Sequence, residues 1–388
     1  MPTHTHAALF AAVALVAAAA GSGARAAATA LNDTGLTQCV DRHGTWSSDC
    51  ARSRQDAGDG RDAHDADPGD GLAGFSFRKV CRSGEFAGEG HCPADPALGS
   101  GPDDWGCTHD NVTRLTWEAK TADGGLHDGQ ARFSNRGARA RDAPLDAAWF
   151  AHAVNGEALC GSTGWRLPTV AELQSIVDYG MGAPGSSAPY VDPAYFPNTQ
   201  ALQAWTGTAW AADAKRAWTV DFYVGGLGTD RRGWGFPVRL VHGADAQAHR
   251  PRFVPSADGN EVTDTLTGLV WRRCAAGQHW DPIDQRCDGI LIQFDWPQAL
   301  DYAQANRQGG WRVPNVKELA SIVDQATHHP AADRQAFPDM PTHLPFFSST
   351  PKSQDGMVYV HGIEFATGSL LAGQDPTWLL RLVRRGRE

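Results

Sequence analysis

The sequence predicts an α+β protein built from two tandem domains with antiparallel sheets, preceded by an irregular, cysteine-containing N-terminal region. Two observations lead to this prediction. The decapeptide GWRLPTVAEL at residues 164–173 returns as GWRVPNVKEL at residues 310–319. In each copy the helical patterns come early and the strand patterns come late, which is typical of an antiparallel α+β domain rather than of an alternating α/β fold.

The internal repeat extends well beyond the decapeptide. DNVTRLTW at 110–117 matches DTLTGLVW at 264–271, AWTGT at 204–208 matches FFSST at 346–350, and VRLV at 238–241 matches LRLV at 380–383. The order is the same in both copies, and a period of about 145 residues is the length of a domain. We therefore expect domains at residues 101–243 and 252–388, each with its own core, and a separate N-terminal region at residues 31–100.

The decapeptide has the pattern of a capped helix start. Thr169 and Glu172 form a Thr-x-x-Glu capping box, and Asn315 and Glu318 hold the same places in the second copy. The apolar spacing that follows predicts helices that end near residues 178 and 324. We expect each tryptophan to fill a core and each arginine to pair with a carboxylate. The set with this structural role comprises Trp165, Arg166, Pro168, Thr169, Glu172, Trp311, Arg312, Pro314, Asn315 and Glu318.

The remaining elements follow from apolar periodicity. An earlier helix is expected in each copy, at residues 144–155 and 296–307. Strands are expected in the first copy at residues 114–117, 204–210, 217–224 and 237–241. The second copy has corresponding patterns at residues 268–271, 346–350, 357–363 and 379–383.

The N-terminus has the pattern of a signal peptide. An apolar run within residues 6–21 precedes the small residues GARAAATA, which predicts a signal peptide over residues 1–28, although the start carries no Lys or Arg. The run is shorter than the roughly 20 residues that a membrane span needs, and no later segment qualifies. We expect an exported protein that is periplasmic, secreted or held at the cell surface.

All eight cysteines follow the signal region, which fits an oxidising compartment. Closure of short loops favours three local disulfides, and the two remaining cysteines would then pair across the first copy. The spacing of zinc sites is absent. The expected pairs are Cys39–Cys50, Cys81–Cys92, Cys274–Cys287 and Cys107–Cys160.

Charge limits the range of partners. A net charge of −10 gives no basic footprint for nucleic acid and disfavours anionic membranes. An acidic, Gly-rich run could offer oxygen ligands to Ca²⁺, but its spacing departs from the known calcium loop, and a solvated loop is the favoured interpretation. We therefore expect no metal or other cofactor. The acidic residues of this run are Asp56, Asp59, Asp62, Asp65, Asp67 and Asp70.

Taken in order, DNVTRLTW, GWRLPTVAEL, AWTGT, WTVDF and VRLV resemble the DUF1566 family, also named the Lcl C-terminal domain family. The resemblance covers both copies, and NDTG at residues 32–35 is similar to the leader of multi-copy members. It implies a C-type-lectin-like fold and an exported bacterial protein, and one branch of the family binds sulfated glycosaminoglycans as an adhesin. The RLPT element is also similar to one in the formylglycine-generating enzyme family.

The function expected from these features is non-catalytic binding or adhesion to a glycan or another envelope or surface polymer. Lectin-like folds bind ligands in the long loop region, here residues 181–237, and the calcium-chelating sugar motifs are absent. Aromatic faces and arginine forks in this region suit sugars that carry sulfate or carboxylate. The candidate ligand-binding residues are Trp234, Arg231, Arg232, Trp205 and Tyr190, with Tyr195 in the same loop region.

Two alternatives stay open. The repeats could present surfaces to a protein partner in a structural or assembly role in the cell envelope. An oxidase related to formylglycine-generating enzymes is less favoured, because that chemistry relies on a cysteine pair late in the domain and the last cysteine here is Cys287. Motifs of serine hydrolases, zinc proteases and P-loop enzymes are absent, so we expect no enzymatic activity.

Overall fold

A computed structural model describes residues 31–41, 43–60, 74–137, 143–182, 189–243, 252–354, 357–374 and 376–386. The predicted signal peptide at residues 1–28 lies outside these ranges. None of the described helices has both the length and the apolar character needed to cross a membrane.

The element order repeats once along the chain. The N-terminal region contains β1 (Cys39–Val40), β2 (Trp46–Ser47) and α1 (Asp56–Asp59). The first domain contains β3 (Phe77–Cys81), β4 (Trp105–Asp110), β5 (Thr116–Glu118), α3 (Ala147–Gly156), η3 (Leu159–Gly161), α4 (Val170–Ser175), η4 (Tyr179–Gly182), β6 (Gln203–Ala209), β7 (Arg216–Asp221), β8 (Gly226–Arg231) and β9 (Val241–His242). The second contains β10 (Phe253–Pro255), β11 (Glu261–Asp264), β12 (Leu269–Arg272), β13 (Gln278–Asp281), β14 (Arg286–Gly289), α5 (Trp296–Ala305), α6 (Val316–Ser321), β15 (Phe346–Gln354), β16 (Met357–Glu364), β17 (Ser369–Gln374) and β18 (Val383–Arg385).

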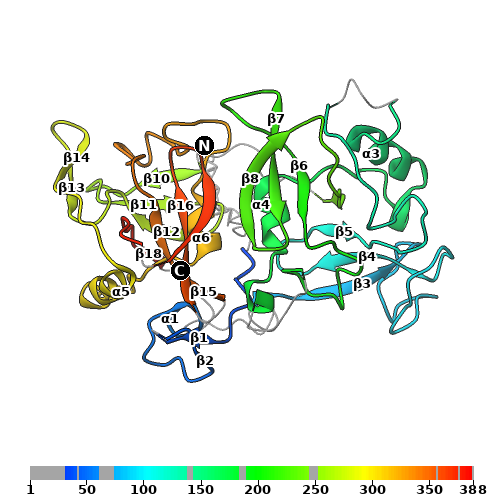
Figure 1. Cartoon of the computed structure of the whole chain (residues 1–388), viewed down its shortest axis with the longest axis horizontal. Coiled ribbons are helices and arrows are strands. Elements are labelled where there is room, and N and C mark those ends of the chain that lie inside the picture. Colours follow the sequence, from blue (N-terminus) through cyan, green and yellow to red (C-terminus); the bar gives the residue numbers. More distant parts are fainter. Residues whose placement is uncertain are drawn as a thin grey trace, which may run out of the picture.

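The sheets are antiparallel, and their orders match between the copies. One four-stranded sheet runs β3-β4-β5-β9 and its counterpart runs β10-β11-β12-β18. The three late strands of each copy join in one six-stranded sheet, β15-β16-β17-β8-β7-β6. Figure 1 shows the second domain on the left and the first on the right, with the short elements of the N-terminal region below them. The predicted α+β class and the tandem arrangement are confirmed.

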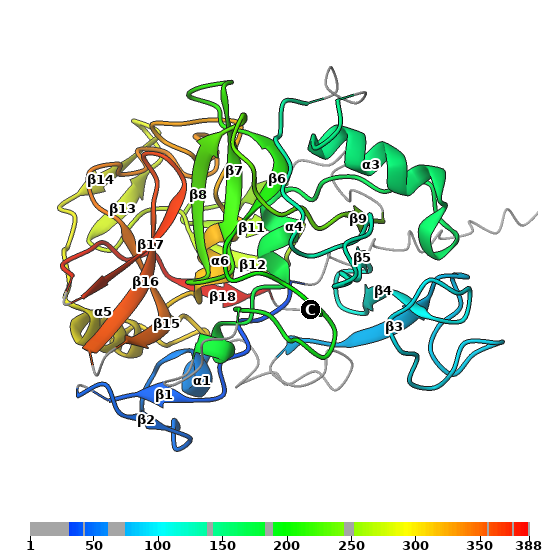
Figure 2. The same ribbon diagram turned by 45° about the vertical axis from the view of Figure 1, so that its right-hand side comes forward.

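The two copies meet as the halves of a two-fold dimer would. β8 and β17 are corresponding strands, and they pair antiparallel through Leu227 and Leu370 at the centre of the six-stranded sheet. Helices α4 and α6, which also correspond, pack against each other beside this sheet (Figure 2). Contacts between identical elements across an axis are the mark of an isologous interface, here formed within one chain.

The expectation that each copy encloses its own core is wrong. The largest cluster of buried apolar side chains contains residues of both copies, among them Trp117 and Trp218 of the first and Trp271 and Phe365 of the second. Each copy also has a smaller core of its own, around Trp165 and around Trp311. Burying the joined sheet against both α4 and α6 removes more apolar surface from water than two separate domains could.

The decapeptide recurs because it connects three parts of each copy. The backbone of Arg166 exchanges two hydrogen bonds with Val241, at 3.0 and 2.9 Å, and Arg312 does the same with Val383 at 2.9 and 3.0 Å. The carbonyl of Pro168 accepts from Gly207, and that of Pro314 accepts from Ser349. The segment thus binds the closing strand and the first strand of the late sheet before its helix begins.

Both predicted capping boxes are present. Thr169 Oγ1 accepts from the Glu172 amide and Glu172 Oε2 accepts from the Thr169 amide, while Asn315 and Glu318 form the same pair. The predicted helices to residues 178 and 324 are too long, because α4 ends at Ser175 and α6 at Ser321. The hydroxyl of Ser175 bonds the carbonyl of Glu172 at 2.7 Å, as Ser321 does with Glu318.

The strands predicted at residues 237–241 and 379–383 begin later, at Val241 and Val383. In the first copy, the amide of Leu240 donates to the buried carboxylate of Glu118 at 3.0 Å instead of to a neighbouring strand. The structure contains the four disulfides that the sequence predicts, Cys39–Cys50, Cys81–Cys92, Cys107–Cys160 and Cys274–Cys287.

Candidate functional site

A cavity of about 510 Å³ lies between the N-terminal region and the first domain. The N-terminal region forms one wall, the residues leading into β3 a second, and the segment after α4 a third. Ligand pockets are typically about 300–1,000 Å³, so this cavity has room for a small molecule or one or two sugar units. Its described lining consists of Gly35, Leu36, Thr37, Gln38, Trp46, Phe75, Ser76, Phe77, Ile176, Asp178, Gly180, Met181, Asp192 and Tyr195.

The wall from the N-terminal region is held by a buried segment, residues 32–34, which lies between the two copies. The amide of Asn32 donates to Asp110 Oδ2 at 2.7 Å in the first domain. The carboxylate of Asp33 accepts from the Asn315 side chain in the second. Because Asn32, Asp33 and Thr34 are all buried, the segment contributes to the interior and does not lie loosely on the surface.

Two of the three residues that differ between the decapeptides contact this segment. Asn315, in the place of Thr169, caps α6 with its oxygen and donates to Asp33 with its nitrogen. Lys317 stands where the first copy has Ala171, and its ammonium donates to the carbonyls of Asp33 at 2.6 Å and Ser175 at 2.8 Å. Asn315 donates to Asp33 through a nitrogen that is separate from the oxygen that caps the helix, and an alanine at position 317 could not bridge the copies.

A close backbone approach shapes the floor of the cavity. Gly35 has φ +81°, and a Cβ at this position would overlap the carboxylate of Asp178. The same carboxylate accepts from the Gly180 amide at 2.8 Å. The carbonyl of Thr34, one residue earlier, accepts from the Tyr179 amide at 2.7 Å. Glycine at position 35 therefore lets the N-terminal segment contact the turn after α4 directly.

Aromatic rings cover one side of the cavity. Phe75 and Phe77 stack with their centroids 5.5 Å apart, and Tyr195 lies 5.6 Å from Phe77. Trp46 of β2 lines the same space. Half-buried rings that combine apolar faces with polar edges are suited to binding ligands that have both characters.

Two carboxylates add charge to the lining. One oxygen of Asp192 accepts from the Ala194 amide at 2.8 Å, and its other oxygen has no hydrogen-bond partner among the described residues. Burial raises the pKa of Asp178, Lys317 and the amides of Gly180 and Met181 oppose this, and the charge of Asp192 adds to the increase. Such a pair of acceptors can bind hydroxyl or ammonium donors.

The second copy has different side chains at two positions that correspond to lining residues of the cavity. Phe253 pairs with Asp264 as Phe77 pairs with Asp110, so Arg252 corresponds to Ser76 of the first copy. The Arg252 guanidinium bonds Asp264 at 2.9 Å and lies over the Phe253 ring at 4.7 Å. By alignment of the two Phe-Pro pairs at 196–197 and 337–338, the tyrosine of the cavity is replaced by Ala336. The second copy therefore has the Arg252 guanidinium where the first has the Ser76 hydroxyl, and it has no aromatic ring where the first has Tyr195.

The sequence-predicted ligand set does not come together. Trp205 is fully buried at 0% exposure and donates to the Phe133 carbonyl at 2.8 Å, and Tyr190 is 7% exposed against Tyr179. Both are core residues, so assigning them to a surface site was wrong. The Arg232 guanidinium is held by the carbonyls of Ala214 and Asn135.

Trp234 and Arg231 keep the exposure that a binding role requires. Trp234 is 54% exposed, and Arg231 is exposed at the end of β8. Neither is part of the cavity lining. Of the aromatic residues predicted in the long loop region, only Tyr195 is in the lining.

The acidic run at residues 56–71 is not wholly a solvated loop. Asp56 is 4% exposed, and one of its oxygens accepts from Thr34 at 2.7 Å and Thr350 at 3.0 Å. Asp59 pairs with Arg307 at 3.1 Å. Both residues join the N-terminal region to the second domain, so the solvated-loop prediction is wrong for them. Asp62, Asp65, Asp67 and Asp70 lie outside the described residues, and the question of Ca²⁺ binding there is untested.

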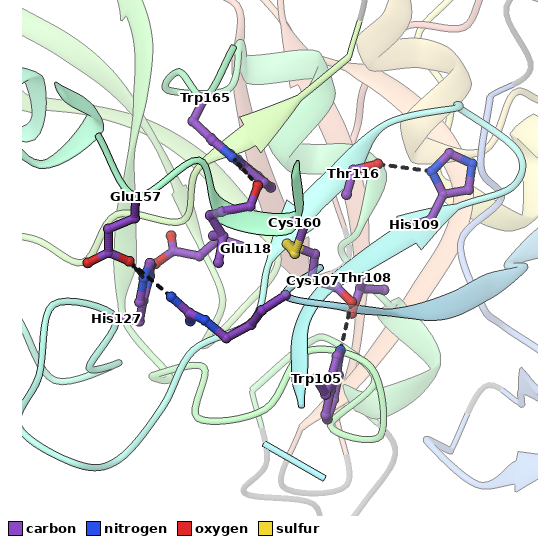
Figure 3. The surroundings of a disulfide bond; sticks show 12 residues. Trp105, Cys107, Thr108, His109, Thr116, Glu118, His127, Glu157, Cys160 and Trp165 are labelled. Carbon is purple, nitrogen blue, oxygen red and sulfur yellow. Dashed lines mark hydrogen bonds and ion pairs between the residues drawn. A yellow bond between two sulfur atoms is a disulfide. The ribbon is translucent and has the colours of Figure 1, made fainter. Parts of the chain in front are cut away.

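A second charged cluster surrounds the Cys107–Cys160 disulfide (Figure 3). The His127 ring lies between two carboxylates, with Nδ1 at 2.9 Å from Glu118 and Nε2 at 3.1 Å from Glu157. Glu118 also accepts from Lys120 at 2.8 Å. Burial acts to lower the pKa of His127, but hydrogen bonds and charge from Glu118, together with Glu157, outweigh it and raise the pKa.

This cluster has the character of a structural network. Both ring nitrogens of His127 are engaged, and Glu118 accepts from three donors, so its groups are already mutually satisfied. The second copy has Arg272 in the place of Glu118, and that guanidinium lies over the Trp311 ring at 4.1 Å. The cluster is therefore particular to the first copy.

Reasoning from sequence missed most of the cavity. The rings of Phe75 and Phe77 and the carboxylate of Asp192 belong to no motif that marks them as a site. One usable signal was present, because the NDTG segment precedes the first domain and the decapeptides differ at Thr169/Asn315 and Ala171/Lys317. These differences indicated that the second copy contacts something that the first does not.

Comparison with known proteins gives one family match. The model of the family described as Lcl C-terminal domain matches two segments, residues 106–242 and 260–384, which together are more than half of the chain. No curated protein matches this chain. The two segments correspond to the two copies of the repeat.

Proposed function

This chain belongs to the Lcl C-terminal domain family, and we propose that it is an exported, non-catalytic binding protein that holds a glycan of the cell envelope or surface. The proposed site is the cavity between the N-terminal region and the first domain. The observation that supports it is the joint presence of stacked aromatic rings and hydrogen-bond acceptors in a space of about 510 Å³. Four disulfides fit an exported protein.

The difference between the two copies supports a binding role for the cavity. The capping boxes, the Arg-x-Pro pairings and the sheet orders are kept in both copies, as a folding device requires. The cavity is formed in the first copy, where Ser76 and Tyr195 stand, while Arg252 and Ala336 hold these places in the second. A ligand site needs to exist only once per chain, whereas a core is needed in every copy.

A catalytic role has less support. All eight cysteines are joined in disulfides, so no free cysteine pair is left for the chemistry of the formylglycine-generating oxidases. The carboxylates of the cavity have no histidine or lysine among their neighbours in the described lining. The proposal is therefore binding without turnover.

One observation favours a protein partner as a second candidate. The β13–β14 hairpin, fastened by the Cys274–Cys287 disulfide, displays Ile283 at 89% exposure and Ile290 at 85%. Two apolar side chains so exposed on a rigid hairpin suit contact with another protein. This surface could fix the protein within an assembly while the cavity holds a glycan.

The experiment that tests the proposed function is a glycan array probed with the full chain, wild type and Tyr195→Ala. Alanine is the residue that the second copy has at this position, so the fold should tolerate it. We expect the wild type to retain a defined glycan class. The variant should bind at least about tenfold more weakly, because one aromatic contact face is lost.

Trp234→Ala is the matched control, since it removes an exposed aromatic residue outside the cavity. It should bind as the wild type does. Binding that is lost in Trp234→Ala and kept in Tyr195→Ala would move the site to the surface near Arg231. An array without any retained glycan would reject the function.

A further inference from the structure

We infer that the ligand of the cavity is a sugar bearing a primary ammonium group, a glucosamine-type unit, and not a sulfated or uronic-acid glycan. This inference rests on the proposed function and names the ligand class of the same site. It is argued from the charge of the lining, from the partners of its two carboxylates and from its aromatic wall.

The charge of the cavity is negative. Among its described lining residues, Asp178 and Asp192 are the charged ones, and none is Lys, Arg or His. The chain as a whole carries a net charge of −10. A sulfate or carboxylate entering here would meet like charges and no guanidinium or ammonium among the described lining residues, which costs free energy in a half-buried site. The nearby Lys317 ammonium is buried and already donates to the carbonyls of Asp33 and Ser175.

The two carboxylates differ in what already faces them. Asp178 accepts from the backbone of Gly180, and the Lys317 ammonium acts on it through its charge. One oxygen of Asp192 accepts a hydrogen bond from the Ala194 amide, while its other oxygen is without a described partner. A carboxylate that lines a cavity and has one oxygen without a partner among the described residues can accept from a charged donor, and ammonium donates more strongly than hydroxyl.

The aromatic wall suits a cation as well as a sugar ring. The Lys317 ammonium, outside the lining, lies 4.5 Å from the centroid of Phe75 and so occupies one lining ring, while no described cation lies over Phe77 or Tyr195. Phe77 and Tyr195 continue the wall beyond Phe75. Aromatic faces attract cations through the negative charge of the ring face, and they also cover the apolar face of a sugar.

The test is calorimetric titration of the full chain with a glucosamine hexamer, an N-acetylglucosamine hexamer, a heparin hexasaccharide and spermidine. The acetylated hexamer has the same rings without the charge, and spermidine has ammonium groups without rings. We expect the glucosamine hexamer to bind at least about tenfold more tightly than each of the others, as one charge-assisted hydrogen bond implies.

Asp192→Asn removes the charge and keeps the oxygen that accepts from Ala194. Asp333→Asn is its matched control, because Asp333 accepts from Gln335 in the same turn of the second copy, at 2.8 Å. Asp192→Asn should weaken the glucosamine hexamer about tenfold and leave the acetylated hexamer unchanged, and Asp333→Asn should behave as the wild type.

Equal or tighter binding of heparin, of the acetylated hexamer or of spermidine would overturn the inference, as would an equal loss in both asparagine variants. These outcomes leave the proposed function standing wherever a glycan still binds and Tyr195→Ala weakens that binding at least about tenfold. An absence of all glycan binding would instead reject the proposed function itself.

Discussion

At the scale of residues, the two decapeptides differ where the N-terminal segment binds. Asn315 and Lys317 contact Asp33, whereas Thr169 and Ala171 have no such task. The residues that both copies share keep the fold: the Arg312–Glu318 pair and its counterpart Arg166–Glu172 each make two hydrogen bonds of 2.6 and 2.7 Å. The residues that both copies share therefore stabilise the fold, and the residues that differ make contacts found in one copy.

Asp56 carries a prediction about pH. Burial raises the pKa of Asp56 to about 6, against hydrogen bonds from Thr34 and Thr350, with Glu318 adding to the increase and Arg312 opposing it. A carboxyl whose pKa is higher in the folded protein binds its proton more tightly there. Its contribution to stability is therefore fully present below the unfolded pKa near 3.8 and is lost as pH rises to about 6.

Asp56→Asn should remove this loss, because the amide has no charge and its oxygen can still accept from both hydroxyls. At pH 7.5 we expect the melting temperature of the variant to exceed that of the wild type by at least about 2 °C. At about pH 3.5, below the unfolded pKa, the two should agree closely. Thermal unfolding at both pH values measures this, and a constant difference across the range would contradict it.

At the scale of elements, the capped helices were predictable and their ends were not. Thr-x-x-Glu and Asn-x-x-Glu are local patterns, so they identify the starts of α4 and α6 directly. The ends depend on where Ser175 and Ser321 turn back onto the helix, and the turn that follows α4 is held by the distant segment at Thr34. Such partners have no trace in a window of ten residues.

The two capping boxes also differ in burial, which gives a prediction with an internal control. The Arg312 and Glu318 side chains are 8% and 0% exposed, whereas those of Arg166 and Glu172 are 33% and 14%. Glu318→Gln leaves a buried guanidinium without its charge partner, which costs about 3 kcal/mol of unfolding free energy. Glu172→Gln, at the more exposed pair, should cost about 1 kcal/mol.

Urea unfolding followed by tryptophan fluorescence would compare the two glutamine variants. We expect the larger decrease in midpoint for Glu318→Gln. Equal midpoints would mean that exposure does not separate the two ion pairs, and the account of their burial would then be wrong.

At the scale of the molecule, the duplication produces an internal dimer that has lost its symmetry. Leu227 and Leu370 join the sheets at the pseudo-two-fold axis, and buried residues of both copies form one core. The N-terminal segment then binds asymmetrically, through Asn32 to the first copy and Asp33 to the second. The cavity lies where this asymmetric segment contacts the turn after α4 in the first copy.

The sequence was sufficient for the duplication, the α+β class, the disulfide pairs and the structural role of the decapeptide, because each depends on local or repeated patterns. The sequence did not predict the shared core, because a strand buried between two copies has the same apolar pattern as a strand buried within one domain. The sequence did not predict the cavity, because its three walls come from segments that are far apart in the chain. It placed Trp205 in a surface site, because the residue type alone does not show whether a side chain is buried or exposed.

The central claim is that a ligand binds where the N-terminal segment meets the first copy, and nowhere in the second. Hydrogen exchange followed by mass spectrometry, on the full chain with and without the glucosamine hexamer, tests this most directly. The account predicts slower exchange in residues 35–46, 75–77 and 176–195, with residues 322–336 of the second copy unchanged. Protection around residues 231–234, or equal protection in both copies, would contradict it.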